Sequence, residues 1–438
     1  MENEISKTKK DFFLAGKAYG VLGVTSSLIA TIFGASAILG LTDDAALNGL
    51  PAAWFLLSGA AGFAGLLLIL NKIDFSNFHS ISEYFGSVFG EGYRKFSALL
   101  ILISWTAIIA AQFVAVGKVF SVILNLNFNY GVMLTAIIIF SYTSVGGQKG
   151  VVGTDKIQLL GIAAGLIYLL SIIDMSVIKT AFNYQDKKYL FEFPINEKFN
   201  LTNLITMLIA GGVPYLIGPD IYSRLLVADK KQTVYKSVFI SIFIIIIAAF
   251  AIVLIGIYFK LIMPEIQKDF IFNFFKNQNY YIKISFALFV FCVIGSSADT
   301  CLMTSATLVT NDILKISKSG KKIIYTTRTA MIIIVSIASL IAIAKPVIIK
   351  NLLLSYKIFS ISFLTPFVYN IIFELKKVKF NIWFLYAFNL ISLVTFFWLE
   401  FINNKFSFIF AVILYFVLFG VYLFKIKRFN SSSAFAEK

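Results

Sequence analysis

Two carboxylates stand in apolar stretches of this 438-residue sequence, where charged side chains are rare. Asp299 follows the run FVFCVIG, and spacings of three and four residues place Ser296, Asp299 and Thr300 on one helical face. A carboxylate inside an apolar helix must face a cavity or a partner. It could serve a cation site, a proton site or a salt bridge, and the sequence leaves these three open.

The second carboxylate, Asp155, lies in the glycine-rich stretch SYTSVGGQKGVVGTDKIQ. Two interpretations fit it. Thr154 could cap a helix with Asp155 in its first turn, where the positive end of the helix dipole stabilises a negative charge. Alternatively, Asp155 faces a water-filled vestibule on the cytoplasmic side and helps a cation to bind or leave there.

Two apolar segments contain residues that interrupt helices. IFGASAILG places Gly34 and Gly40 around the five residues 35–39, and AGGVPYLIGPD carries three glycines and two prolines. Glycine loosens a helix and proline removes a backbone donor, so we expect both segments to unwind locally and free carbonyl oxygens. For either segment alone, a packing contact between helices is the alternative.

The elements that position these residues follow from composition. Hydrophobic residues make up 59% of the chain and charged residues 14%, with a mean hydropathy of +0.87, as is typical of an integral membrane protein. Twelve apolar runs are each long enough to cross about 30 Å of hydrocarbon as a helix. They cover 19–41, 51–71, 96–125, 131–145, 151–173, 201–219, 234–259, 281–308, 326–345, 351–373, 380–400 and 405–424.

The basic residues indicate the topology. The net charge of +16 is spread over short loops, which argues against nucleic acid as a partner. Most of the Lys and Arg residues, with Arg224 counted among them, fall in loops that a cytoplasmic N-terminus places inside. We therefore expect a multi-pass protein of the plasma or inner membrane with both termini in the cytoplasm.

The cysteine and histidine content argues against an enzyme. Cys292 and Cys301 both fall in the eighth span, and His79 is the single histidine. This leaves no disulfide framework, no cluster with metal-ligand spacing and no histidine-based triad.

The two interrupted segments lie in the first and sixth spans. These positions are equivalent if spans one to five repeat as six to ten with inverted topology, a pattern in which paired broken helices mark the substrate and ion site of secondary transporters. The expected divisions are a cytoplasmic segment 1–18, a first repeat 19–173, an extracytoplasmic loop 174–200, a second repeat 201–373, two additional spans 374–424 and a cytoplasmic tail 425–438.

Five segments resemble, in order, motifs of the sodium:solute symporter family. YTSVGGQKGVVGTDKIQ is similar to the family signature Tyr-Thr-x-x-Gly-Gly-x-x-Ala-Val-x-x-Thr-Asp-x-x-Gln, with Gly150 in place of alanine. Further resemblances, with Lys17 in place of arginine, are DFFLAGKAYG, FHSISEYFGSVFGEGYRKFSALL, GPDIYSRLLVADKK and SSADTCLMTSATLVTNDILK. The resemblance covers about residues 11–315. It implies an all-α membrane fold, the LeuT-like five-plus-five inverted repeat, with two additional C-terminal helices and about 12 transmembrane helices.

The resemblance also implies a sodium site. In that family, carbonyls of the broken first helix and oxygens of the eighth helix hold the ion, which suits a hard cation. The matching positions here are the carbonyls of Ala35, Ile38 and Val293 and the hydroxyls of Ser296 and Ser297.

A second cation site of some family members matches Asp155, Asp299 and Thr300. Because an aspartate stands at 299, this chain could bind a second sodium ion, a proton or a salt-bridge partner there.

The solute site is expected beside the two breaks and on spans three and eight. Ser36, Gln112 and Tyr215 are the candidates, since each offers hydrogen bonding at membrane depth, although Gln112 could equally bond a neighbouring helix. Spans one to three contain no arginine to clamp a carboxylate, which disfavours a large acidic sugar.

The predicted function is that of a sodium-coupled symporter, with sodium as the coupling ion. It would import a small organic solute, such as an amino acid or a carboxylate, by alternating access. The alternatives are a proton-coupled symporter of the same fold and a membrane-embedded solute sensor. The sequence requires no protein partner and leaves the solute, the stoichiometry and the oligomeric state open.

Overall fold

The computed structural model describes residues 12–436, apart from 14, 71, 73–77, 79, 317–319, 345, 376–377 and 379. The first eleven residues of the expected N-terminal segment and His79 therefore lie outside the described residues. Helices joined by short loops make up the described chain, and its one extended pairing is a bridge between Tyr19 and Ala228. The all-α prediction is confirmed.

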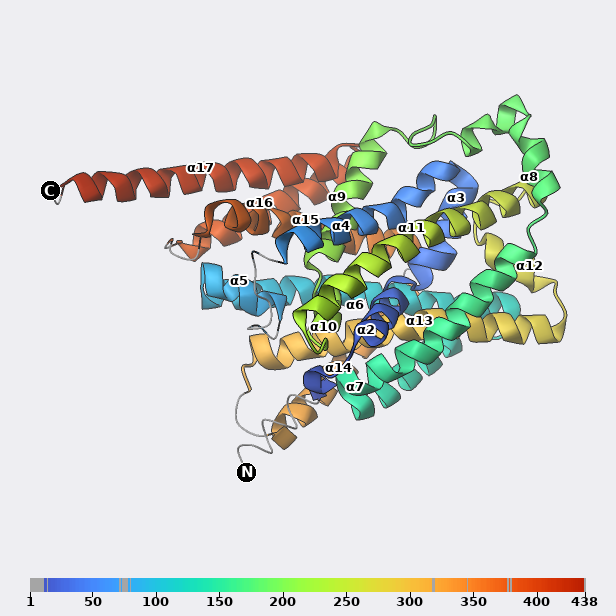
Figure 1. Cartoon of the computed structure of the whole chain (residues 1–438), viewed down its shortest axis with the longest axis horizontal. Coiled ribbons are helices and arrows are strands. Elements are labelled where there is room, and N and C mark those ends of the chain that lie inside the picture. Colours follow the sequence, from blue (N-terminus) through green and yellow to red (C-terminus); the bar gives the residue numbers. More distant parts are fainter. Residues whose placement is uncertain are drawn as a thin grey trace.

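The helical elements follow one another along the chain without a soluble domain between them among the described residues (Figure 1). Their bounds are η1 Ala15–Lys17, α2 Val21–Ile32, η2 Ser36–Gly40, α3 Leu41–Asn48, η3 Leu50–Ala53, α4 Trp54–Ile69, α5 Ile81–Phe89, α6 Glu91–Lys118, η5 Val119–Ile123, α7 Phe128–Ser171, α8 Met175–Phe182, η6 Gln185–Leu190, α9 Leu201–Ile217, α10 Pro219–Leu225, α11 Lys231–Ile262, α12 Phe270–Lys276, α13 Tyr280–Leu308, η7 Val309–Ile313, α14 Gly320–Ala344, α15 Ile348–Phe373, α16 Ile382–Phe401 and α17 Ser407–Ala436.

The predicted number of spans agrees with these helices. Among the described residues, 10 helices are long and apolar enough to cross a membrane, and α2 with the η2–α3 segment forms one further bent pair. The 44 residues of α7 would measure roughly 66 Å as one straight helix, about twice the hydrocarbon thickness. Because α7 bends in the middle, it accounts for the fourth and fifth predicted spans, and twelve spans result.

The bend in α7 lies at Gly147, whose φ of 54° and ψ of −154° are not helical. A Cβ atom at this position would lie 2.7 Å from the ring of Phe12, so a larger residue would meet both strain and a clash. The glycine-rich stretch therefore forms a turn between two spans, as the sequence predicts.

Both interrupted helices are present. The first span bends by 58° between α2 and the segment Ser36–Asn48. The sixth ends at Gly218, whose extended backbone separates α9 from α10, which begins with Pro219. The glycines earlier in α9 stay helical and buried, and α9 packs along α4 there, so the alternative of a helix-packing contact holds for that part of the segment.

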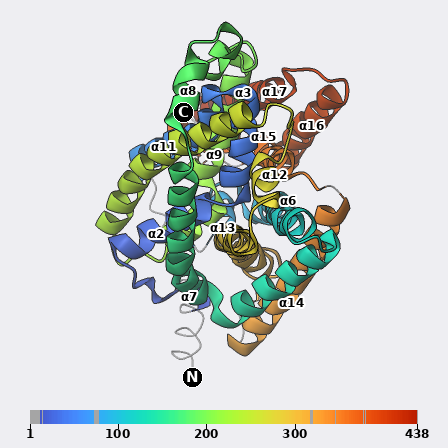
Figure 2. The same ribbon diagram turned by 90° about the vertical axis from the view of Figure 1, so that its right-hand side faces the viewer.

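Two long helices occupy the centre of the molecule. In the most apolar stretches of α6 with η5 and of α13 with η7, 72% and 78% of the residues are buried, whereas in that of α16 the share is 22%. Figure 2 looks along the helices and shows α13 and α6 near the middle, with α16 and α17 at the edge. The two C-terminal helices are thus additions to a ten-helix core, which is the predicted LeuT-like architecture. The residue bounds expected for the two repeats stay predictions.

The loops and short helices that the predicted topology places on opposite sides of the membrane lie at opposite ends of the molecule. In Figure 1 the C-terminal end of α17 and the short α5 lie at the left, whereas α8 and α12 lie at the right. At the left end, Arg94 pairs with Asp312 at 2.7 Å and so joins α6 to η7. At the right end, the carboxylate of Asp43 accepts the N–H groups of Asp269 and Phe270, both at 2.8 Å, and holds the start of α12 against α3.

The sidedness can be tested with cysteines at the two ends. We expect Asp186→Cys, between α8 and α9, to react with a membrane-impermeant maleimide in right-side-out vesicles, because this side chain is exposed and the loop is predicted to lie outside. Lys230→Cys, in the loop before α11, should react only after permeabilisation. The unmodified chain is the control, since Cys301 is buried and Cys292 partly so. Labelling of Lys230→Cys in intact vesicles would contradict the predicted topology.

Candidate functional site

The break in the first span lies beside the middle of α13. Phe33 closes the last turn of α2 by donating to the carbonyl of Ile29, and Ala35 N–H donates to Gln112 Oε1 on α6 at 2.8 Å. The break lies inside the segment 32–40 that the sequence predicts to unwind, at its N-terminal end. The helix opens at Phe33 and Gly34 because the Gln112 side chain takes the N–H that would otherwise continue the helical ladder.

A buried ion pair joins α7 to α10. Arg224 Nη2 lies 3.2 Å from Asp155 Oδ2, and neither side chain has any exposed surface. Removing two charges from water costs several kcal/mol for each ion, and only close partners offset that cost. The ion pair therefore fixes where α10 sits after its break.

Hydroxyl groups surround this pair. Ser27 Oγ donates to Asp155 Oδ2 at 2.5 Å, and Arg224 Nε donates to Thr31 Oγ1 at 3.1 Å. Arg224 Nη2 also donates to Thr300 Oγ1. Four helices thus meet at one guanidinium: α2, α7, α10 and α13.

Asp299 lies on the far side of Thr300. Its Oδ2 accepts from Tyr142 Oη at 2.9 Å, and its Oδ1 lies 3.3 Å from Thr300 Oγ1. The three residues of the predicted second cation site are thus brought together, and the Arg224 guanidinium lies between Asp155 and Thr300.

Two expectations about Asp155 are wrong. The residue lies about two turns after the bend at Gly147, and the hydroxyl of Thr154 lies 2.9 Å from the Val151 carbonyl, where it can only donate. An N-cap side chain would instead accept a backbone N–H. Asp155 is also fully buried, so it does not face a hydrated vestibule in this structure. Its ionic partner is Arg224.

The predicted sodium ligands on α13 lie together. Ser296 Oγ is 3.1 Å from the Val293 carbonyl, and Ser297 Oγ donates to the Thr31 carbonyl at 2.8 Å. A Cβ atom at Gly34 would lie 2.5 Å from Ser297 Oγ, which shows how closely the break approaches α13. Among the described residues, no group of three or more His, Cys, Asp or Glu side chains could hold a metal ion. The serine hydroxyls and main-chain carbonyls at this point are neutral oxygens, which suit a hard cation.

Ala35 and Ile38 lie after the break. The Ile38 carbonyl accepts the Thr42 hydroxyl at 2.7 Å within a continuous helix, and Ser297 bonds to Thr31 instead of to either of them. Their role as sodium ligands stays a prediction.

The three solute-site candidates line one small cavity of about 20 Å³. Ser36, Gln112 and Tyr215 meet there with Ser297, and the buried hydroxyl of Ser36 has no hydrogen-bond partner in the part of the chain that the structure describes. Gln112 also bonds the backbone of α2, as its alternative interpretation predicts.

Sequence reasoning missed four residues of the site. Asp220 and Tyr356 line the same cavity, and Arg224 and Thr31 form the charged network behind it. GPDIYSRLL contains both charged residues, and its placement directly after an apolar, broken helix was the available signal. Because the sequence analysis assigned Arg224 to a loop, this signal was overlooked.

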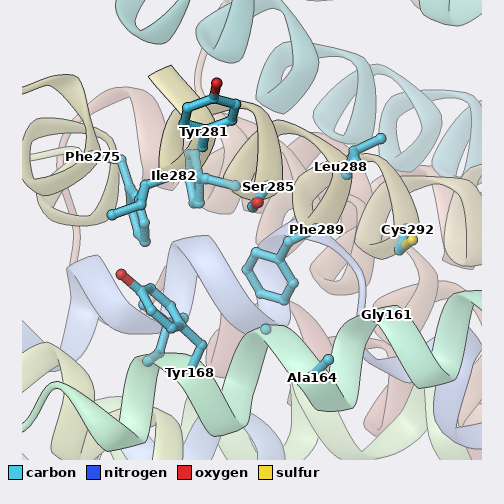
Figure 3. Close-up of a pocket in the computed structure, with 13 residues that line it drawn as sticks. Gly161, Ala164, Tyr168, Phe275, Tyr281, Ile282, Ser285, Leu288, Phe289 and Cys292 are labelled. Carbon is cyan, nitrogen blue, oxygen red and sulfur yellow. The ribbon is translucent and has the colours of Figure 1, made fainter. Parts of the chain in front are cut away.

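A larger cavity, of about 470 Å³, lies elsewhere (Figure 3). It opens between α7 and α13, and Phe289 and Tyr168 face each other across it. Leu288 at its rim is 63% exposed, which places this apolar groove on the side that faces the lipid. It shares no lining residue with the small polar cavity.

Comparison with known proteins identifies the family. A sequence model described as the sodium:solute symporter family matches residues 12–381. The chain belongs to this family. The match covers the broken helices, the ion pair and the small cavity, and it makes the chain a multi-pass membrane protein by kinship as well as by its helices.

Curated members of the sodium:solute symporter family match parts of the chain. It is 26% identical over 245 residues to the sodium/proline symporter of Haemophilus influenzae, covering 52% of this chain and 48% of that protein. It is 26% identical over 259 residues to the human high affinity choline transporter 1, covering 56% and 43%. The chain thus spans about half the length of the curated relatives it matches, or less.

A solved structure matches almost the whole fold. It is the substrate-bound outward-open state of a Na+-coupled sialic acid symporter, with a TM-score of 0.75 and 16% identity, covering 94% of this chain and 91% of that one. The likeness establishes that the sodium:solute symporter chain described here has the same fold.

The buried pair makes a stability prediction. Asp155→Asn should destabilise the protein by about 3–5 kcal/mol, because it leaves a buried guanidinium without its carboxylate. Adding Arg224→Gln should restore part of this loss, since no uncompensated charge then remains. Thermal unfolding in nanodiscs of Asp155→Asn, of Arg224→Gln and of the double mutant measures these changes in stability.

The matched control is Asp186→Asn, which breaks the exposed pair with Lys187 at 3.0 Å and should leave the unfolding temperature unchanged. A double mutant as unstable as the sum of its single changes would show that Asp155 and Arg224 do not act as a pair.

Proposed function

We propose that the protein is a sodium-coupled symporter that imports a small organic solute by alternating access. Family membership supports the class of activity, and one observation carries its assignment to this site. The broken turn of α2 lies against the serines of α13, with Ser297 Oγ 2.8 Å from the Thr31 carbonyl. Oxygens from two spans therefore converge at one point inside the membrane, as a dehydrated cation requires.

The proposed sodium ligands from α13 are the Val293 carbonyl and the hydroxyls of Ser296 and Ser297. The predicted partners from the first span are the carbonyls of Ala35 and Ile38. The geometry favours instead the carbonyls of the last turn of α2, at 30–33, because the break lies there and Ser297 touches that turn.

We infer that a single sodium ion is coupled to each solute. The residues of the predicted second cation site, Asp155, Asp299 and Thr300, lie around the Arg224 guanidinium, which supplies a tethered positive charge. A second sodium ion there would be repelled by the arginine.

The solute would bind beside Ser36, Gln112 and Tyr215, next to the sodium site. Sodium that bridges α2 and α13 would order the walls of this cavity, and by linkage each ligand would raise the affinity of the other. The cavity of about 20 Å³ holds little more than a water molecule, so the helices must separate to admit a solute. In the proposed transport cycle, the cavity opens alternately to the two sides of the membrane. Both termini are proposed to lie in the cytoplasm.

The test is uptake of radiolabelled proline, choline and iodide, the solutes named for relatives, into proteoliposomes with an inward sodium gradient. Uptake that depends on sodium supports the proposal. Uptake driven equally by a proton gradient without sodium would favour the proton-coupled alternative. Binding of a solute without transport would favour the sensor.

The sodium site makes a quantitative prediction. Ser296→Ala and Ser297→Ala should each raise the sodium concentration for half-maximal transport about tenfold, because a lost ligand worth about 1.4 kcal/mol changes affinity by that factor. Ser104→Ala is the control, since Ser104 is buried in α6 and bonds only its own helix, at the Leu100 carbonyl. Unchanged sodium dependence in both α13 variants would place the ion elsewhere.

A further inference from the structure

The small polar cavity has an uneven distribution of charge. Its lining includes one carboxylate, Asp220 at the start of α10, and neither a lysine nor an arginine is among its described lining residues. Three aromatic rings from three other helices complete it: Phe55 from α4, Tyr215 from α9 and Tyr356 from α15. Carboxylates and aromatic faces are groups that attract cations.

The carboxylate of Asp220 is incompletely satisfied. The Trp105 indole N–H and the backbone N–H groups of Asp220 and Ile221 lie close enough to interact with this carboxylate. Among the described residues, however, no group makes a hydrogen bond of full geometry to the buried Oδ1. A buried anionic oxygen without a partner is costly, and a site retains one where a ligand supplies the partner. Ser36 Oγ, also buried and without a partner, lines the same cavity and offers a second polar contact.

Arg224 does not supply that partner, although it lies one turn after Asp220 on α10. Its guanidinium pairs with Asp155 and donates to Thr31 and Thr300. Among the described residues, Arg224 pairs with Asp155 and forms no ion pair within 4.0 Å with Asp220.

The charges of the whole site point the same way. Three carboxylates, at 155, 220 and 299, lie in or beside the cavity, whereas the Arg224 guanidinium and one sodium ion supply two positive charges. One further positive charge would balance the site when sodium and solute are both bound.

We propose that the solute carries a positively charged nitrogen, as a protonated amine or a quaternary ammonium group, which pairs with Asp220 and packs against the rings of Phe55, Tyr215 and Tyr356. This inference rests on the proposed transport function and adds the chemical class of the solute. The guanidinium behind the cavity is neutralised by Asp155, so it leaves Asp220 to the solute.

The experiment measures thermal unfolding of the full chain in nanodiscs with four probes at equal concentration: choline, L-proline, lactate and glucose. Choline and proline carry a positive nitrogen, lactate is an anion and glucose is neutral. In sodium chloride, choline or proline should raise the unfolding temperature, whereas lactate and glucose should not. Each titration is repeated in potassium chloride.

Variants then assign the effect to the carboxylate. Asp220→Asn should weaken binding of the stabilising probe at least tenfold, whereas Asp220→Glu, which keeps the charge, should retain most of the affinity. Asp186→Asn, at an exposed position, should bind like the wild type. Stabilisation of Asp220→Asn by sodium alone shows that this variant is folded.

The outcomes separate the two proposals. Stabilisation by lactate or glucose as strong as by choline and proline would overturn the solute class. So would no stabilisation by either probe with a positive nitrogen, or wild-type affinity in Asp220→Asn. Stabilisation by choline or proline that is equal in potassium would support the solute class and contradict sodium coupling. Sodium-dependent stabilisation by lactate alone would support sodium coupling and contradict the solute class.

Discussion

The buried contact between Asp155 and Arg224 is the constraint on which the site depends. A guanidinium and a carboxylate without exposed surface need close partners to offset the loss of hydration. Ser27 and Thr31 on α2 and Thr300 on α13 contact Asp155 Oδ2 and Arg224 Nε and Nη2, so one charged side chain links four helices. Among the described residues, Asp155 Oδ1 and Arg224 Nη1 are buried without a hydrogen-bond partner. Because Arg224 follows the break at Gly218 and Thr31 precedes the break at Phe33, both interrupted helices are anchored at the same point.

The same anchor connects the ion site to the solute site. Thr31 accepts from Arg224 through its hydroxyl and from Ser297 through its carbonyl, so it touches both the charged network and the proposed sodium ligands. Asp220 projects from the helix that carries Arg224 and lines the small cavity. Any movement that separates α2 or α10 from α13 must therefore break these contacts or carry them along. Sodium beside Ser297 would stabilise the arrangement in which the cavity walls are closest.

Much of this could be predicted from the sequence, because long apolar runs, glycine and proline punctuation and charge bias act locally. The spans and both broken helices follow from such patterns. The meeting of Ser297 with the first span follows instead from the resemblance to the family. The exact residue at which the first span opens could not be predicted, because it depends on Gln112, a side chain from another helix. The Asp155 environment was misjudged for a similar reason, since a carboxylate near a loop looks hydrated until its partner, 69 residues away along the chain, is known. Contacts between distant segments carry no local signal.

The central claim is that the Arg224 guanidinium takes the place of a second coupling cation. Equilibrium binding of radioactive sodium-22 to the purified full chain, in the presence of a stabilising solute, tests it most directly. The bound ion should saturate at one sodium per protein molecule. Saturation at two sodium ions per molecule in the wild type would contradict the claim, because the space between Asp155 and Thr300 would then hold an ion as well as the arginine.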